Sequence, residues 1–311
     1  MTITLRAFLT HIRESITGRN AYLSSARHLR PVRKITNVKT LTIKNMTNYC
    51  FTLGYNLVSE IEKTTRLLYQ LNDSRDFKHL VVDLGFPLEH GGIVPDNIDE
   101  AKERNSEKLK KLAAAFGSEY VKMSNIGVSQ NWTQVYEYLK PSDDDILIGT
   151  DPDEHPLNVG WVKAIGDVIR EGNFGLVSLM MTSHIQLLSS VPRNERFYGN
   201  RRVYLFPAGA LNWALIGVSG KFFNIIKEMP FPTEAPRYGW IEGSLYPLLA
   251  RHGFGWCVLA DYQVRHTDFE LGDQGTSSLL REWKNQIIFN IHQYGQLSFD
   301  EWLEMRREGR I

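Results

Sequence analysis

The sequence predicts an α/β fold, with a mixed and mainly parallel sheet flanked by helices, and three observations lead to it. The chain has 311 residues, 42% of them hydrophobic, which is enough to bury a large core. From about residue 40, short apolar runs alternate with helical patterns, as in parallel strands joined by crossover helices. An acidic cluster follows the apolar run at residues 146–149 and so lies at the carboxyl end of a predicted strand. Open α/β sheets bind ligands at the carboxyl ends of their strands.

The pattern divides into three expected parts. A basic, helical N-terminal extension covers residues 1–39, the α/β domain covers 40–270, and a C-terminal helical extension covers 271–311. The first part holds eight Arg and Lys residues and only one acidic residue, Glu14. Such a segment either packs on its own domain or contacts phosphate groups or an anionic membrane surface. Nucleic-acid binding is not expected from it.

Cysteine content and hydropathy indicate in which cellular compartment the protein is expected. Cys50 and Cys257 are the two cysteines and lie far apart, so neither a disulfide framework nor a cysteine metal site is predicted. No stretch is long and apolar enough to span a bilayer, and no signal peptide is recognisable. We therefore expect a cytoplasmic protein, either soluble or peripheral to the inner face of a membrane.

The first half of the domain is predicted to alternate strands and helices. The expected strands are residues 41–44, 79–82, 119–123 and 146–149, and the expected helices begin after residue 48 and cover 101–116 and 132–139. The 101–116 segment is rich in Lys, Glu, Leu and Ala, as suits an exposed amphipathic helix. The run at 146–149 is uninterrupted and apolar, which is typical of an inner strand buried on both faces.

The second half continues the alternation with one interruption. A helix at 160–170 and a strand at 174–179 are followed by an arginine-rich stretch at 193–202 that predicts a polar, cationic loop. Further strands are expected at 203–205, 211–218, 256–259 and 262–264, and helices from 221 and at 241–251, 279–292 and 299–306. Ser298 precedes the last helix with Glu301 three residues later, which is the spacing of a capping box.

Asp151 and Asp153 are the first candidates for chemistry, because they flank Pro152 directly after the predicted inner strand. Two carboxylates at an extended strand end suit a hard divalent cation. Such a cation can bridge the two phosphates of a nucleoside diphosphate and neutralise the charge that develops as it leaves. The motif alone is more often a solvated turn, and its position after a buried strand is what favours the metal site.

Two later residues carry alternatives of their own. Glu242 stands at a predicted helix start, where it can act as a general base toward an acceptor hydroxyl or simply stabilise the helix N-terminus. His266 follows the last predicted strand, where a neutral imidazole can complete a metal shell or form an ordinary hydrogen bond.

Taken in order, these features resemble the GT-A glycosyltransferases, in particular their family-2-like group, over about residues 40–268. The resemblance implies that Asp83 contacts the nucleotide base, that Asp151 contacts the ribose and the metal, and that Asp153 and His266 are metal ligands. Asn131 lies where that group holds part of its nucleotide pocket, and it can equally be an ordinary turn residue. Residues beside the donor sugar and acceptor would be Gly209, Asn212, Trp213 and Trp240. Arg202 of the predicted cationic loop can pair with the diphosphate or an anionic acceptor, or it is simply solvated.

The chain departs from the family pattern at two places. Where the pattern reads Gly-Trp-Glu-Asp, this chain reads Gly239-Trp240-Ile241-Glu242, so Glu242 takes the position of the usual base. Residues 45–48 differ from the usual Pro-x-Tyr-Asn turn after the first strand. The metal site is therefore the better supported part of the resemblance.

The resemblance implies a metal-dependent glycosyltransferase that uses Mn²⁺ or Mg²⁺ and moves a sugar from a nucleoside diphosphate, expected to be UDP, to a hydroxyl acceptor. The acceptor classes are a glycan, a lipid-linked glycan or a small glycoside, and the expected course is inversion with Glu242 as base. Three alternatives stay open: a retaining transferase, a sugar-phosphate nucleotidyltransferase, and a non-catalytic module. Against the nucleotidyltransferase, the chain has no glycine-rich basic loop after the first predicted strand that would bind a triphosphate.

Overall fold

The computed structural model describes residues 46–55, 57–87, 97–182, 193–206, 215–230, 242–266 and 278–311. Contacts between residues group 46–311 into one compact unit. None of the helices in these ranges is both long and apolar enough to cross a membrane.

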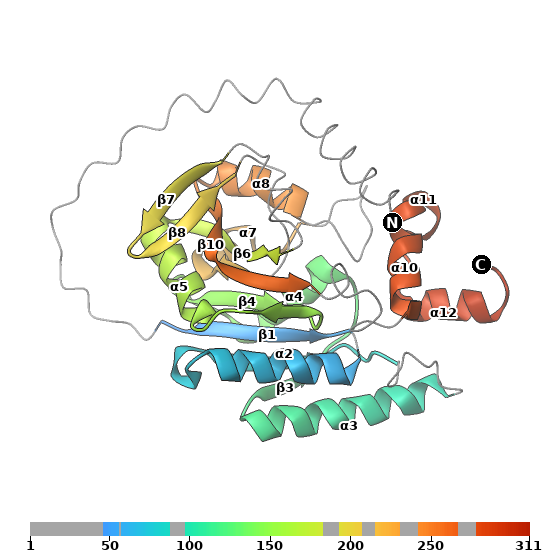
Figure 1. The fold of residues 1–311 in the computed structure, drawn as a ribbon. Coiled ribbons are helices and arrows are strands. Elements are labelled where there is room, and N and C mark those ends of the chain that lie inside the picture. The colour runs from blue at the N-terminus through green and yellow to red at the C-terminus, as the bar shows by residue number, and fades with distance from the viewer. Residues whose placement is uncertain are drawn as a thin grey trace. The chain divides into compact units, whose positions relative to one another are not determined.

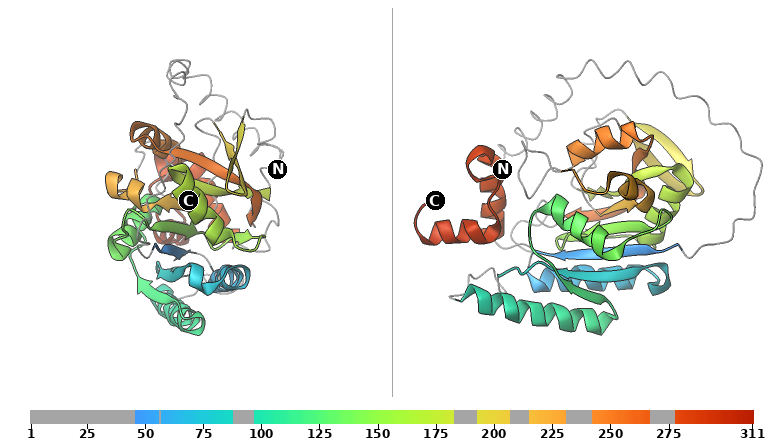
Figure 2. Two further views of the ribbon diagram at one scale, coloured as in Figure 1. Left: turned by 90° about the vertical axis from the view of Figure 1, so that its left-hand side faces the viewer. Right: turned by 180° about the vertical axis from the view of Figure 1, so that it is seen from behind.

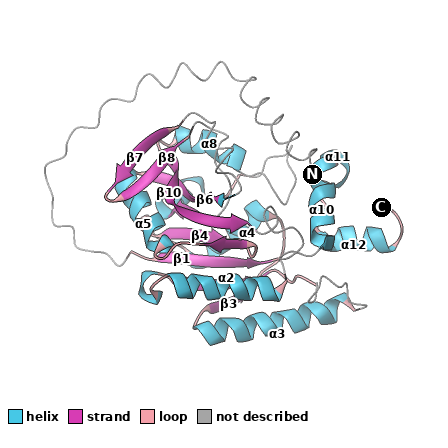
Figure 3. Ribbon diagram, viewed as in Figure 1, coloured by secondary structure: helices cyan, strands magenta, loops and turns pink. Residues whose placement is uncertain are grey.

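A mixed sheet, ten-stranded in the described part of the chain, forms the centre of this unit (Figures 1 and 3). Nine strands follow the order β3-β2-β1-β4-β9-β6-β10-β8-β7, and β5 pairs with β10. The strands β3, β2, β1 and β4 are parallel, as are β6 and β10, whereas β9 runs antiparallel between β4 and β6. The bounds are β1 Asn48–Gly54, β2 Lys78–Asp83, β3 Glu119–Lys122, β4 Ile146–Thr150, β5 Glu154–Pro156, β6 Phe174–Met181, β7 Asn194–Tyr198, β8 Arg201–Leu205, β9 Ile216–Ser219 and β10 Gly255–His266.

Helices cover both faces of the sheet, which makes the predicted α/β class correct. The helices of the domain are α2 Val58–Leu71, α3 Ile98–Phe116, α4 Val128–Leu139, α5 Trp161–Gly172, α7 Gly220–Ile226 and α8 Glu242–Arg251. Apolar side chains of α2, α3 and α5 pack on one face, and those of α4, α7 and α8 pack on the other. Helix α2 contacts β1, whereas α3 contacts α2, β2 and β3. Both views of Figure 2 show α2 and α3 on the same side of β1.

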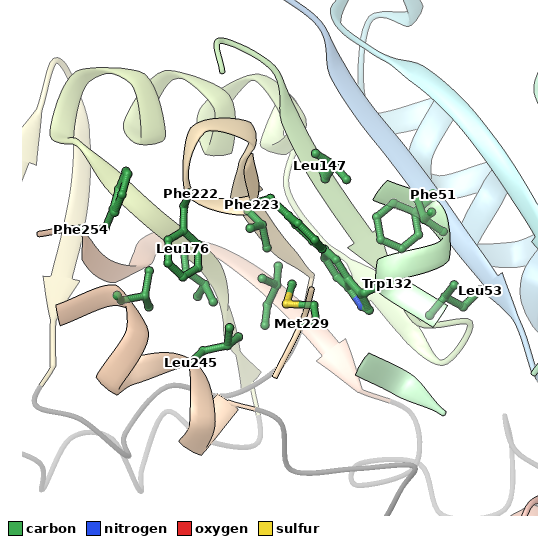
Figure 4. Close-up of a cluster of buried hydrophobic side chains, with 14 of the residues drawn as sticks. Phe51, Leu53, Trp132, Leu147, Leu176, Phe222, Phe223, Met229, Leu245 and Phe254 are labelled. Atoms are coloured by element: carbon green, nitrogen blue, oxygen red, sulfur yellow. The ribbon is translucent and has the colours of Figure 1, made fainter. Parts of the chain in front are cut away.

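Alternating side chains of the inner strands supply the two cores. On β1, Phe51 points into the cluster of Figure 4, where its ring meets Trp132 of α4 edge-on at a centroid distance of 4.6 Å. The neighbouring Cys50 points into the opposite cluster, which contains Trp161 of α5. A strand buried on both faces has apolar residues at successive positions, which explains the uninterrupted run at residues 146–149.

The start of the domain differs from the sequence prediction. Residues 41–44 lie outside the described residues, and the segment after Asn48, expected to lead into a helix, forms β1. Hydrogen bonding to β2 on one side and β4 on the other makes this segment a central strand. The polar Asn48 and Thr52 obscured the pattern, but both are buried with side-chain partners: Asn48 donates to the carbonyl of Asp76, and Thr52 meets Thr150 at 2.8 Å.

The predicted cationic loop at residues 193–202 is also wrong, because it folds as the β7–β8 hairpin. The arginines do not prevent pairing, since their side chains contact partners along the sheet surface. Arg202 donates from Nε to Oδ1 of Asp261 at 3.0 Å, and Arg201 pairs with the Tyr262 hydroxyl. The two closing strands expected at 256–259 and 262–264 are a single strand, β10, with an irregular register between Leu259 and Gln263.

The C-terminal helices are α10 Ser278–Phe289, α11 Ile291–Tyr294 and α12 Phe299–Arg307. Their apolar side chains form a cluster with Leu57 and Phe86, which follow β1 and β2. Figure 1 accordingly shows α10 beyond the end of the sheet toward which the β1 arrow points. The capping box at Ser298 and Glu301 is confirmed, with both reciprocal hydrogen bonds present.

Candidate metal and nucleotide site

The two aspartates of the Asp151-Pro152-Asp153 segment follow β4 directly, at the carboxyl edge of the parallel strands. A turn reverses the chain, and the next three residues form β5, which pairs antiparallel with the end of β10. The register sets Glu154 opposite His266. This pairing brings the imidazole Nε2 of His266 to 3.8 Å from Oδ2 of Asp153. Residues 113 positions apart in sequence are thus joined by one short strand.

The turn is held rigidly from α2. The hydroxyl of Thr64 donates a hydrogen bond of 2.6 Å to the carbonyl oxygen of Pro152. The side chain of Asp153 is completely buried, so its carboxylate is fixed in a low-dielectric environment. A buried carboxylate is costly unless a cation accompanies it. Two cationic or potentially cationic groups do so here, His266 and Lys284, whose Nζ lies 3.5 Å from Asp153 Oδ2.

The acidic groups of this segment repel one another, and their pKa values show it. Burial and the charge of Asp153 raise the pKa of Asp151 to about 6, against the opposing effects of Tyr55, Lys284 and His266. Burial and the charge of Asp151 raise the pKa of Glu154 well above its usual range. The pKa of the Tyr55 phenol is raised as well, by burial and then by the charges of Asp151 and Asp153. An added cation would relieve this accumulation of negative charge.

Glu154 has a separate role that the sequence reasoning missed. Its Oε2 accepts hydrogen bonds from the backbone N–H groups of Asp151, at 3.1 Å, and Leu215, at 2.9 Å. The side chain is 1% exposed, so these contacts are fully shielded from water. Glu154 therefore ties the acidic turn to the entry of β9. No sequence spacing signals a contact of this kind, because Leu215 is distant in the chain.

Asp83 lies at the same edge of the sheet, at the end of β2, which is the strand next to β1. Its Oδ1 accepts from the backbone N–H of Gly85 at 2.8 Å, and its Oδ2 accepts from the Tyr120 hydroxyl at 2.7 Å. Burial and the Asp83 contact raise the pKa of Tyr120 to about 12. Asp83 is therefore a rigid, buried carboxylate whose remaining lone pairs are the ones a ligand would meet.

Asn131 organises the loop before its own helix. Its Oδ1 accepts from the backbone N–H of Ile126 at 3.1 Å, and its Nδ2 donates to Asn125 Oδ1 at the same distance. Gln134 also donates to Asn131 Oδ1. The buried amide thus shapes the connection between β3 and α4.

The other predicted site residues are placed less closely together or fall outside the described ranges. Arg202 lies on the β7–β8 hairpin, paired with Asp261 and over the ring of Tyr204. Glu242 is the first residue of α8, as expected for a helix start, and nothing is described of its side chain. Gly209, Asn212, Trp213 and Trp240 lie outside the described residues.

Asp151, Asp153 and His266 offer carboxylate oxygens and an imidazole nitrogen, which are the kinds of ligand that divalent cations take. Within the described ranges, no three His, Cys, Asp or Glu side chains converge closely enough to form a complete shell. Asp153 and His266 come nearest to such a shell, with 3.8 Å between Oδ2 of Asp153 and Nε2 of His266. Neighbouring ligands of a six-coordinate cation lie about 3.0 Å apart, so these two side chains have to move slightly closer to share one ion. Asp151 supplies a further carboxylate from the same turn.

The sequence matches no protein-family model and no curated protein. Among solved structures, the chain is similar to a mannosyltransferase from Pyrobaculum calidifontis in complex with GDP-Man and Mn²⁺. The TM-score is 0.51 at 14% sequence identity, over 92% of this chain and 73% of that one. This chain has the GT-A fold.

A glucosyl-3-phosphoglycerate synthase from Mycobacterium tuberculosis, in complex with Mg²⁺ and uridine diphosphate, is a further match with a lower TM-score of 0.42 at 16% identity. The match extends over 70% of this chain and 71% of that one. At 14% identity the likeness to the mannosyltransferase shows the fold alone.

Proposed function

We propose that this GT-A protein is a metal-dependent glycosyltransferase that moves a sugar from a nucleoside diphosphate donor, UDP in the first instance, to a hydroxyl acceptor. The observation that carries the proposal is the approach of His266 to the buried carboxylate of Asp153 at the carboxyl edge of the parallel strands. This edge is where α/β sheets bind ligands. The sequence order of the same residues led to the same site.

Asp153, His266 and Asp151 are the residues that would hold the cation. Mn²⁺ or Mg²⁺, when bound, would neutralise the charge on the departing diphosphate. Thr64 keeps the turn in place through its bond to Pro152, so that the ligands need little rearrangement. Burial of the turn excludes water and strengthens each electrostatic contact inside.

The nucleotide would lie along the edge from β4 to β2. Asp83 would accept a hydrogen bond from the base with a lone pair left by Gly85 and Tyr120. Asn131 would contribute by fixing the loop before α4, which borders the same edge of the sheet. Asp151 would accept from the ribose as well as face the cation.

The transfer step needs a base for the acceptor hydroxyl. Glu242, at the start of α8, would take that proton as the acceptor oxygen attacks the sugar carbon, giving inversion. Gly209, Asn212, Trp213, Trp240 and Arg202 remain proposed contacts of the sugar and acceptor. A retaining transferase would not need the base, so Glu242→Gln would abolish turnover only in the inverting mechanism.

Calorimetric titration of UDP with and without Mn²⁺ tests the donor site. In the wild type we expect binding that depends on Mn²⁺, and in Asp153→Asn we expect affinity at least tenfold lower, because the carboxylate charge is lost in an isosteric side chain. Asp167→Asn is the control, since Asp167 pairs with Lys163 on the outer surface of α5. Absence of binding for uridine, guanosine and thymidine diphosphates alike would refute the proposal.

A further inference from the structure

Lys284 of the C-terminal helix α10 reaches the centre of the proposed metal site. Its Nζ lies 3.5 Å from Oδ2 of Asp153, the same oxygen that lies 3.8 Å from His266 Nε2. The ammonium also lies over the ring of Tyr55, 5.9 Å from its centroid. The Lys284 side chain is 25% exposed, whereas that of Asp153 is 0% exposed. A residue outside the predicted transferase domain thus contacts a predicted metal ligand.

The placement of Lys284 follows from the packing of α10. Leu280 and Ile287 precede and follow it by four and three residues, so all three share one side of the helix. The two apolar residues are buried in the cluster with Leu57 and Phe86 at the carboxyl ends of β1 and β2. Docking of this apolar stripe therefore directs Lys284 toward the acidic turn.

The charges of the site explain why a cation is needed there in the absence of metal. Asp151, Asp153 and Glu154 are close together, and burial makes an uncompensated carboxylate costly. Lys284 supplies a single positive charge to the most deeply buried of the two aspartates. A divalent cation on Asp153 Oδ2 would lie about 2.1 Å from that oxygen, within a few ångströms of the ammonium and with the same sign of charge.

We propose that Lys284 competes with the divalent cation for Asp153, so that metal binding displaces the ammonium. The proposal rests on the metal site of the proposed function and adds a regulatory element to it. In the metal-free protein, Lys284 neutralises Asp153 and α10 stays docked over the site. When the cation binds, Lys284 loses this partner, and the contact between α10 and the acidic turn weakens.

The test compares Mn²⁺ affinity by calorimetry for the full chain at pH 8, after chelation of endogenous metal. Lys284→Met keeps the length of the side chain and removes its charge, and we expect about tenfold tighter Mn²⁺ binding. Lys284→Arg keeps the charge and should stay near the wild type. Lys102→Met is the matched control, because Lys102 pairs with Asp300 of α12 and its loss loosens the same helices without altering Asp153.

A second measurement does not depend on accurate affinities. The rise in Tm on adding Mn²⁺ should be larger for Lys284→Met than for the wild type, since the metal then restores a charge that the variant lacks. Equal or weaker Mn²⁺ affinity in Lys284→Met would overturn the inference and leave the proposed function intact. Tighter binding in both Lys284→Met and Lys102→Met would overturn it too, because helix loosening would then be the cause. Absence of Mn²⁺ binding in every variant would refute the metal site together with the inference.

Discussion

At the scale of single residues, Gly149 shows how closely the core limits side-chain size beside the site. It lies on β4 two residues before Asp151, and a Cβ there would come within 2.2 Å of Cζ2 of Trp132 and 3.0 Å of the Phe51 ring. The glycine is therefore required by the close approach of the indole. The ring of Trp132 is buried and meets Phe51 edge-on, so it cannot move away without opening a gap elsewhere.

We expect Gly149→Ala to lower the free energy of unfolding by about 2–3 kcal/mol through overpacking. Urea denaturation measures the loss, and a double-mutant cycle with Trp132→Leu assigns its cause. The smaller leucine leaves space for the new methyl group, so the double variant should be less destabilised than the sum of the two single variants. Strict additivity would show that the clash with Trp132 is not the cause.

At the scale of elements, the uniformly apolar strand β4 was predictable from the sequence, whereas polar residues concealed β1 and most of the β7–β8 hairpin. The β4 run was found at its observed position, whereas β1 was missed because Asn48 and Thr52 interrupt its pattern. Their polar groups are satisfied by Asp76 and Thr150, which belong to other elements and are distant in sequence. In the β7–β8 hairpin, residues 203–205 were predicted as a strand, whereas β7 and the first two residues of β8 were missed because the partners of Arg201 and Arg202 lie on β10.

The C-terminal helices form an element group with its own core, and this leads to a prediction. Trp302 is completely buried, and its indole N–H donates to Gln286 Oε1 at 2.8 Å, joining α12 to α10. We expect Trp302→Ala to speed amide hydrogen exchange in residues 278–307 by about 100-fold, corresponding to the loss of a buried aromatic side chain. Exchange in β1 and β4 should change little, because their clusters do not include Trp302.

Phe299→Leu serves as the comparison for that measurement, since it keeps an apolar side chain in the same cluster. Its effect on exchange should be much smaller than that of Trp302→Ala. Equal acceleration in the sheet and in the helices after Trp302→Ala would indicate that the two unfold as one cooperative unit, contrary to the prediction.

At the scale of the whole molecule, a buried hydrogen-bond network crosses the sheet through His79. Its Nε2 lies 3.1 Å from the hydroxyl of Thr52 on β1, which in turn meets Thr150 on β4. Its Nδ1 lies 2.8 Å from Ser118 Oγ. Burial lowers the pKa of His79 to about 3, so the folded protein keeps this imidazole neutral across most of the acidic range.

The pH dependence of stability follows from this shift. In the unfolded chain His79 binds a proton below about pH 6.5, whereas in the folded protein it does so only near pH 3. Between these values the unfolded state holds the extra proton, so this residue lowers stability by up to about 1.4 kcal/mol per pH unit as the pH falls. Urea unfolding from pH 7 to pH 4 should show a shallower decline in His79→Gln, and identical slopes would contradict the prediction.

The site was predictable in part, and the division has a physical cause. The proximity of Asp153 and His266 could be predicted from the sequence, because they stand after β4 and at the end of β10, whose ends meet at one edge of the sheet. Lys284, Tyr55 and Glu154 could not be assigned in this way, since their roles depend on contacts between distant segments. A sequence motif identifies the side chains at the end of a strand. Which groups balance their charge depends on how distant segments of the chain pack together.

The register irregularity of β10 has a consequence for how the domain tolerates changes in chain length. Leu259 and Gln263 pair with consecutive residues of β6, so the three residues between them are surplus to the ladder. An inserted residue at this point would lengthen the unpaired segment and leave the pairing on either side unchanged. Past it, residues 264–266 alternate faces in step with β5, and one added residue would turn His266 away from Asp153. One strand therefore contains a stretch that tolerates an added residue and, next to it, a stretch in which an added residue would reverse the side-chain directions.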